Sequence, residues 1–151
     1  MMRRLTHQPV IAWLAFGLWL AWVVFLMLSP GEDSVAEDLS GAFGASELTD
    51  ALGHVVLFGV LTVLLFHALR LHVPVERALK GAAVFVLALG SVLEPAQLLV
   101  YERGAALLDL AANWAGALVA AALLRRIALP SRPERERVRA AHRPDIPPSR
   151  R

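Results

Sequence analysis

The chain has 151 residues, which is enough for one domain, and 57% of them are hydrophobic, with a mean hydropathy of +0.56. This composition lies above the usual soluble range and favours an integral membrane protein. The absence of cysteine excludes disulfides, thiolate metal ligands and a cysteine nucleophile. The formal net charge of +2 hides an asymmetry, because most basic residues lie at the two ends and in one internal loop. That pattern indicates membrane topology and not nucleic-acid binding.

Four apolar runs are each long enough to cross a hydrocarbon core at about 1.5 Å per residue. We expect an all-α membrane bundle with transmembrane helices at residues 10–28, 51–69, 81–100 and 105–124. The first run exceeds the hydrophobic region of a signal peptide and no small-residue cleavage pattern follows it, so we expect it to be retained. Pro95 predicts a kink in the third helix. Residues 1–124 thus form one membrane domain, and residues 125–151, rich in Arg and Pro, form a disordered tail.

The basic residues predict how the helices are oriented. Of the 15 Lys and Arg residues, two precede the first helix, three lie in the loop at 70–80 and nine lie from Arg125 onward, which leaves only Arg103 on the other side. Cytoplasmic segments carry the positive excess in membrane proteins. We therefore expect both termini in the cytoplasm, the tail near anionic headgroups, and residues 29–50 and 101–104 outside.

Seven polar residues fall near the predicted outer ends of three helices. A charge at mid-depth of a bilayer costs about 2.5 to 3.5 kcal/mol on insertion scales, so such residues are candidates for function. Helical spacing predicts that they share faces in pairs, and that the pairs meet inside the bundle because lipid offers polar groups no partners. The seven residues are Asp50, His54, Glu94, Gln97, Arg103, Asp109 and Asn113.

The order and spacing of these residues resemble those of the VanZ-like family of bacterial membrane proteins. The matching motif runs Asp50-x-x-x-His54, Glu94-x-x-Gln97, Arg103 and Asp109-x-x-x-Asn113-x-x-Gly116, and the resemblance covers residues 29–124. Ala51 and Val55 stand where the family usually has a lysine and an aromatic residue. The resemblance implies a multi-pass protein of the bacterial cytoplasmic membrane with a role in the cell envelope. The founding member is linked to teicoplanin resistance, and the family has no settled reaction.

The ionisable residues suggest a catalytic site that faces the outer leaflet. Asp50, His54, Glu94 and Asp109 combine three carboxylates with one imidazole, which would supply a proton donor and a proton acceptor at one place. We expect His54 to be the base, oriented by Asp50, because histidine titrates nearest neutral pH. No serine lies in a recognisable nucleophile motif, so a covalent serine mechanism has little support.

The remaining polar residues suggest ligand contacts. Arg103 would hold a phosphate or carboxylate of a lipid-linked envelope precursor or glycopeptide-type ligand through its planar guanidinium. Gln97 and Asn113 would position that ligand by hydrogen bonds. Membrane lipids are the other expected partners, and nothing points to nucleic acid. The sequence leaves the oligomeric state and the presence of any turnover open.

Three alternatives stand beside the catalytic hypothesis. No metal ligand set is assigned, but a divalent metal held by His54 with Asp50, Glu94 or Asp109 is compatible with the helical spacing. A binding protein without turnover would use the same contacts to capture a lipid-linked precursor or a glycopeptide. The polar residues could also be interhelical glue, since measured interhelical hydrogen bonds average only about 0.6 kcal/mol.

Overall fold

The computed structural model describes residues 7–29, 47–100 and 107–129. In these ranges the protein is all-helical. It consists of α1 (His7–Leu28), α3 (Glu47–Leu69), α4 (Val75–Ala96), a short 3₁₀ helix η2 (Gln97–Leu99) and α5 (Leu107–Ala128). Four of the described helices are long and apolar enough to cross a membrane.

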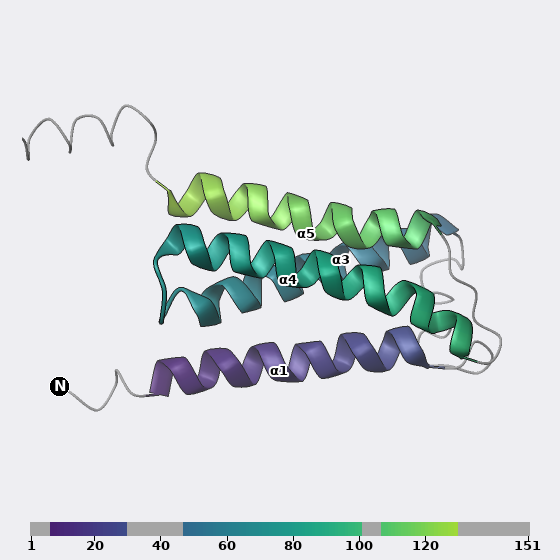
Figure 1. The fold of residues 1–151 in the computed structure, drawn as a ribbon, viewed down its shortest axis with the longest axis horizontal. Helices are drawn as coiled ribbons and strands as arrows, with labels where there is room; N and C mark the ends of the chain where they lie inside the picture. Colours follow the sequence, from purple (N-terminus) through teal and green to yellow (C-terminus); the bar gives the residue numbers. More distant parts are fainter. Residues whose placement is uncertain (1–6, 30–46, 101–106, 130–151) are drawn as a thin grey trace, which may run out of the picture.

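Successive helices run in opposite directions, as Figure 1 shows. The end of α1, the start of α3, the end of α4 and the start of α5 lie at one end of the bundle, which we call the Glu47 end. The start of α1 and the end of α5 lie at the opposite end (Figure 1). Helix α3 is central, because its contacts with the other three long helices are more extensive than those of any other helix, and its largest interface is with α5.

Each of the four long helices extends beyond one of the two bounds predicted from hydropathy. Helix α4 begins at Val75 and not at residue 81, because Pro74 caps its first turn and its carbonyl accepts hydrogen bonds from the backbone N–H groups of Arg77 and Ala78. Helix α5 continues to Ala128 and ends with two arginines in its last turn, where cations interact favourably with the helix dipole. The bounds predicted from hydropathy lie where charged residues begin. A helix can continue through exposed charged residues, so the observed helices are longer at these ends.

Pro95 lies in the last turn of α4, where the sequence predicts a kink. The α-helix ends one residue later, and the chain tightens into the 3₁₀ turn η2 before it becomes extended at Val100. A proline lacks the N–H group that would donate to the carbonyl of Ser91, so the last turn of α4 has one hydrogen bond fewer. The α-helix ends at Ala96 and not at residue 100 as predicted. This change places Gln97 at the Glu47 end of the bundle.

The buried face of α3 forms a continuous seam with alternating three- and four-residue spacing. The seam consists of Ala51, His54, Phe58, Leu61, Leu65 and Ala68. This spacing keeps one stripe of a helix facing its neighbours in a left-handed bundle. His54 is the one ionisable side chain in the seam, so the packing of α3 carries it into the interface with α5.

Large apolar side chains cover the outside of the bundle. Leu18 on α1, Val84 on α4 and Ile127 on α5 are between 67% and 83% exposed. A water-soluble domain rarely exposes contiguous apolar faces of this extent. The exterior therefore has the character expected of helices whose outer faces contact lipid.

Candidate functional site

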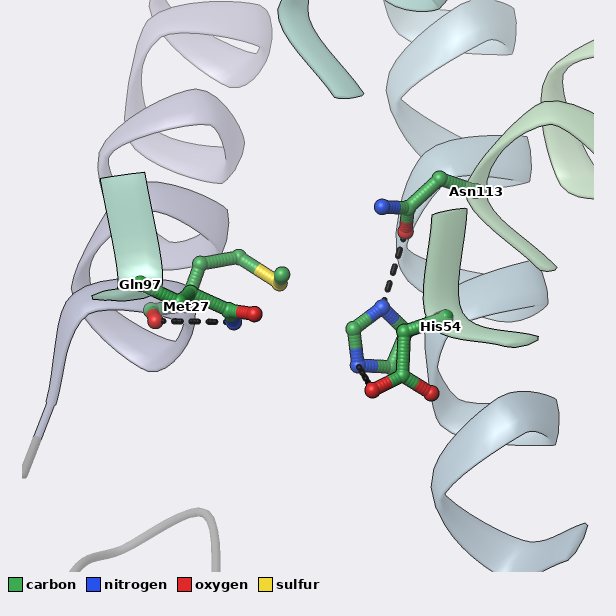
Figure 2. Close-up of polar contacts among 5 residues, drawn as sticks. Met27, His54, Gln97 and Asn113 are labelled. Carbon is green, nitrogen blue, oxygen red and sulfur yellow. Dashed lines mark hydrogen bonds and ion pairs between the residues drawn. The ribbon is translucent and has the colours of Figure 1, made fainter. Parts of the chain in front are cut away.

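His54 is the centre of a buried polar cluster between α3 and α5. Its Nδ1 atom lies 2.9 Å from Oδ1 of Asn113, and its Nε2 atom lies 4.0 Å from Oδ2 of Asp109. Asn113 is fully buried, His54 is 9% exposed, and the side chain of Asp109 is 22% exposed. Figure 2 shows His54 and Asn113 facing each other across the two helices. The cluster thus runs from a buried amide to a partly accessible carboxylate.

The hydrogen bond to Asn113 determines which nitrogen of His54 carries a proton. An amide oxygen only accepts, so Nδ1 must donate to Oδ1. In a neutral imidazole, Nε2 is then an acceptor. A separation of 4.0 Å is too long for a direct hydrogen bond between Nε2 and the Asp109 carboxylate. His54 is therefore oriented to receive a hydrogen at Nε2, beside a carboxylate that would stabilise a positive charge there.

Gly116 allows α5 to approach α3 at this cluster. A Cβ atom at position 116 would overlap the backbone carbonyl of Val55, the residue after His54. On the facing helix, a Cβ atom at Gly59 would lie 3.5 Å from the carbonyl oxygen of Gly116. Small residues permit such close backbone approach between membrane helices. The side chains of His54 and Asn113 can meet because the backbones of their helices are in contact one turn away.

Helix α4 closes the cluster from a third side. A Cβ atom at Gly90 would lie 3.1 Å from Cβ of Asn113 and 3.1 Å from the ring of Phe58, so the α4 backbone packs directly over both side chains. At the next residue of each helix, Nε1 of Trp114 donates to Oγ of Ser91 at 3.2 Å. These contacts fix the rotation of α5 and hold Asn113 against His54.

Gln97 makes a separate contact at the same end of the bundle. Its Nε2 atom donates to the backbone carbonyl of Met27 on α1 at 3.0 Å, and the side chain is 1% exposed. The last carbonyls of a helix have no helical partner, so Gln97 satisfies one of them at the end of α1. Figure 2 shows this contact apart from the pair formed by His54 and Asn113. Glu94 is also buried, in the last turn of α4.

Asp50 does not join His54 as the spacing predicted. It lies on the first turns of α3, is exposed, and makes no hydrogen bond or ion pair with another described residue. The physical reason is the seam of α3, in which Ala51 takes the buried position one turn before His54.

The other predicted site residues have mixed outcomes. The structure brings His54, Asp109 and Asn113 together, whereas Arg103 lies outside the described residues. Within the ranges that the structure describes, no three His, Asp or Glu side chains are grouped as ligands for a metal ion. The divalent-metal hypothesis therefore has no ligand set in this part of the chain.

Two contributors to the site were missed in the sequence. Gly90 has no polar group and no motif, and only its position opposite Asn113 gives it a role. The carbonyl of Met27 is a backbone atom, which residue types alone do not reveal. The end of α1 before Ser29 and Pro30 was nevertheless a usable signal, because unpaired carbonyls are expected there.

Comparisons of the chain with protein-family models, with curated proteins and with solved structures find no match.

Proposed function

We propose that this chain is a multi-pass protein of the bacterial cytoplasmic membrane with four spans and both termini in the cytoplasm. The support is the set of four long apolar helices, their exposed apolar exteriors and the positive charge concentrated at the predicted inner side. In this topology the Glu47 end of the bundle faces the outside. The cluster of His54, Asp109 and Asn113 then lies just below the external surface.

The proposed function is to bind, and exchange protons with, a polar ligand presented at the outer leaflet. The observation that carries this proposal is the orientation of His54, whose Nδ1 is held by Asn113 while Nε2 faces Asp109 at 4.0 Å. A positioned imidazole beside a carboxylate can act as a general base and then as a general acid, which contributes about 10²- to 10⁴-fold to a reaction. Asn113 serves as the orienting group and Asp109 as the group that stabilises the protonated imidazole.

The ligand class follows from the VanZ-like resemblance. His54, Asp109, Asn113 and Gly116 belong to the motif on which that resemblance rests, and they lie together in the bundle. The resemblance implies a cell-envelope role linked to teicoplanin resistance. We therefore propose a lipid-linked envelope precursor or a glycopeptide-type molecule as the ligand, bound with or without turnover.

A structural role is the second candidate, and one observation favours it for one residue. Gln97 is buried and hydrogen-bonded to α1, as expected of interhelical glue. The His54 cluster differs, because Nδ2 of Asn113 is buried and has no hydrogen-bond partner among the described residues. A buried amide N–H group without a hydrogen-bond partner lowers the stability of the fold. A contact with only a structural role would gain nothing from such a group.

Teicoplanin susceptibility of a Gram-positive host tests the proposal. Cells expressing the wild-type chain should show a higher minimum inhibitory concentration than cells with empty vector, and His54→Gln should return it to the vector value. His67→Gln serves as the matched control, since it makes the same substitution in the last turn of the same helix, away from the cluster. Immunoblots of membrane fractions verify equal amounts of each variant. If wild-type protein gives no protection, or if His54→Gln protects as well as wild type, the proposed function is wrong.

A further inference from the structure

The hydrogen bond between Trp114 and Ser91 lies on the outer surface of the α4–α5 interface, which faces lipid in the proposed orientation. Trp114 is 43% exposed, and Ser91 is exposed as well. The indole N–H only donates, so Oγ of Ser91 accepts it at 3.2 Å. The single hydrogen of that hydroxyl group goes to the backbone carbonyl of Leu87 at 2.9 Å. Protein atoms therefore satisfy both side chains, and neither needs a partner from the lipid.

A membrane environment makes this pair hard to separate. Trp114 lies seven residues after the start of α5, which places it about 10 Å along the helix from that end. Tryptophans of membrane proteins usually lie at the headgroups, where polar partners are available to the indole N–H. Hydrocarbon offers no such partners, so a rotation of α5 that parted Trp114 from Ser91 would leave the N–H group unsatisfied. The pair thus opposes rotation of α5 against α4.

The preceding residue of each helix forms a second contact on the inner side of the same interface. A Cβ atom at Gly90 would lie 3.1 Å from Cβ of Asn113, so the α4 backbone touches this side chain. Successive residues of a helix point about 100° apart, which is why Asn113 is buried while Trp114 is exposed. The inner contact limits how closely the helices approach. The outer hydrogen bond determines how α5 is rotated.

The contact between Asn113 and His54 depends on that rotation. Oδ1 of Asn113 lies 2.9 Å from Nδ1 of His54, and its Nδ2 atom has no hydrogen-bond partner among the described residues. No second hydrogen bond in this part of the chain therefore anchors the amide. A displacement of a few tenths of an ångström takes the bond to about 3.2 Å, the upper end of the usual range. Nδ1 donates to Oδ1 whether or not Nε2 also carries a proton.

We propose that Ser91 and Trp114 are positioning residues for His54. Their hydrogen bond holds α5 in the rotation that keeps the Asn113 oxygen on Nδ1 of His54, and it does so from the lipid-facing side of the bundle. This inference rests on the proposed function, because it assigns residues that act on the imidazole only through Asn113.

The tautomer of His54 is the readout, since a merely structural role of the pair would not move it. The full chain, labelled with ¹⁵N at histidine and held in neutral detergent micelles, gives the shifts of both ring nitrogens through correlations with the carbon-bound ring protons. The pH is raised until these shifts no longer change, so that neutral imidazoles are compared. Loss of the signals in His54→Gln assigns them. We expect wild-type His54 to carry its hydrogen on Nδ1.

Removing either partner of the pair should release this tautomer. Ser91→Ala and Trp114→Phe should each raise the fraction of His54 with hydrogen on Nε2 about threefold, which corresponds to the loss of an average interhelical hydrogen bond. The two variants remove the same bond from opposite helices, so either one decides the test if the other fails to fold. Ser91→Thr keeps the hydroxyl group and should restore the wild-type shifts.

Thr62→Val is the matched control, because it removes a hydroxyl group whose hydrogen bond, to the Phe58 carbonyl at 2.8 Å, stays within α3. It should leave the His54 shifts at their wild-type values. Equal changes in Thr62→Val and Ser91→Ala would mean general loosening of the bundle and would overturn the inference. Wild-type shifts in both Ser91→Ala and Trp114→Phe would overturn it too, as would a wild-type His54 with its hydrogen on Nε2.

The outcomes also distinguish this inference from the proposed function. Wild-type shifts in Ser91→Ala, together with loss of teicoplanin protection in His54→Gln, would overturn the positioning role and keep the proposed function. A changed tautomer in Ser91→Ala, together with full protection by His54→Gln, would support the positioning role and overturn the proposed function.

Discussion

At the scale of single residues, the hydrogen bond between His54 and Asn113 stabilises the contact of two helices and also orients the imidazole of the proposed site. Both side chains are buried, and their hydrogen bond spans α3 and α5 at 2.9 Å. Removing one partner leaves the other buried and unsatisfied, which costs more than the bond contributes when both are present. The pair should therefore behave as a coupled unit.

A double-mutant cycle measures this coupling. His54→Ala and Asn113→Ala should each destabilise the folded bundle. The double variant should lose less than the sum by about 0.6 kcal/mol, the average measured for interhelical hydrogen bonds, and by no more than about 1.7 kcal/mol, the largest value measured. Unfolding in detergent mixtures gives the free energies. Asn113→Ala combined with His72→Ala, at the opposite end of the bundle, provides the control and should be additive. Additivity of the His54 and Asn113 variants would show that the contact contributes nothing.

Gln97 offers a second test at the same scale. Replacing it by alanine removes the hydrogen bond to the Met27 carbonyl and leaves a small cavity between α4 and α1. We expect a loss of about 1 to 3 kcal/mol in the free energy of unfolding. Faster hydrogen exchange should be confined to the last turn of α1 if the contact caps that helix. Faster exchange spread evenly over the helices would contradict the capping role.

At the scale of elements, the close approach of α3 and α5 decides whether the cluster exists. Gly116 lies on the same side of α5 as Asn113, and its lack of a side chain lets the Val55 carbonyl of α3 come into contact. The buried seam of α3 then continues past His54 into an apolar core at Phe58 and Leu61. The polar cluster is thus held by the backbone contact on one side and by hydrophobic packing below it.

Gly116→Ala tests that arrangement. The added methyl group would overlap the Val55 carbonyl, so the two helices must separate, and overpacking of this kind costs about 1 to 3 kcal/mol. Separation should also lengthen the contact between His54 and Asn113 and abolish the protection conferred in the susceptibility assay. Gly53→Ala is the matched control on α3, because a Cβ atom there meets nothing within 4 Å.

Gly53→Ala should leave the free energy of unfolding unchanged or raise it by about 0.5 to 1 kcal/mol, since alanine favours the helix over glycine. Stability is measured by the same detergent unfolding for both variants. If Gly116→Ala were as stable and as active as Gly53→Ala, the close approach would not be needed for the site.

At the scale of the whole molecule, the distribution of charge predicts the topology and hence the side on which the cluster lies. The acidic first loop and the basic C-terminal segment fall on opposite sides of the bilayer in the proposed orientation. If the orientation were reversed, the cluster would face the cytoplasm and an envelope ligand would be excluded.

The absence of native cysteine makes this orientation directly measurable. A single cysteine at Ser34 should react with a membrane-impermeant maleimide in intact cells, and a single cysteine at Ser131 should react only after permeabilisation. Both variants change small polar residues outside the four helices, so each should preserve the fold. Protection of the cysteine at position 34 in intact cells would reverse the topology and remove the proposed function.

The features that depend on composition and on helical period were predictable from the amino-acid sequence. Four apolar runs predicted four helices, because a helix of membrane length needs about 20 apolar residues, and the described part of the chain contains them. The spacing of Asp109 and Asn113 likewise placed both on one face, and both contact His54. The length of a helix and the face that two of its residues share depend on that helix alone, and not on the helices packed against it.

Which polar residues meet depends on how the helices pack, and the sequence did not predict it. Asp50 and His54 have the same spacing as Asp109 and Asn113, yet the three-four seam of α3 buries Ala51 and leaves Asp50 exposed. The roles of Gly90 and of the Met27 carbonyl likewise depend on what lies opposite them. The physical reason is that spacing fixes the angle between side chains on one helix, whereas the packing of helices against one another fixes which angle points inward.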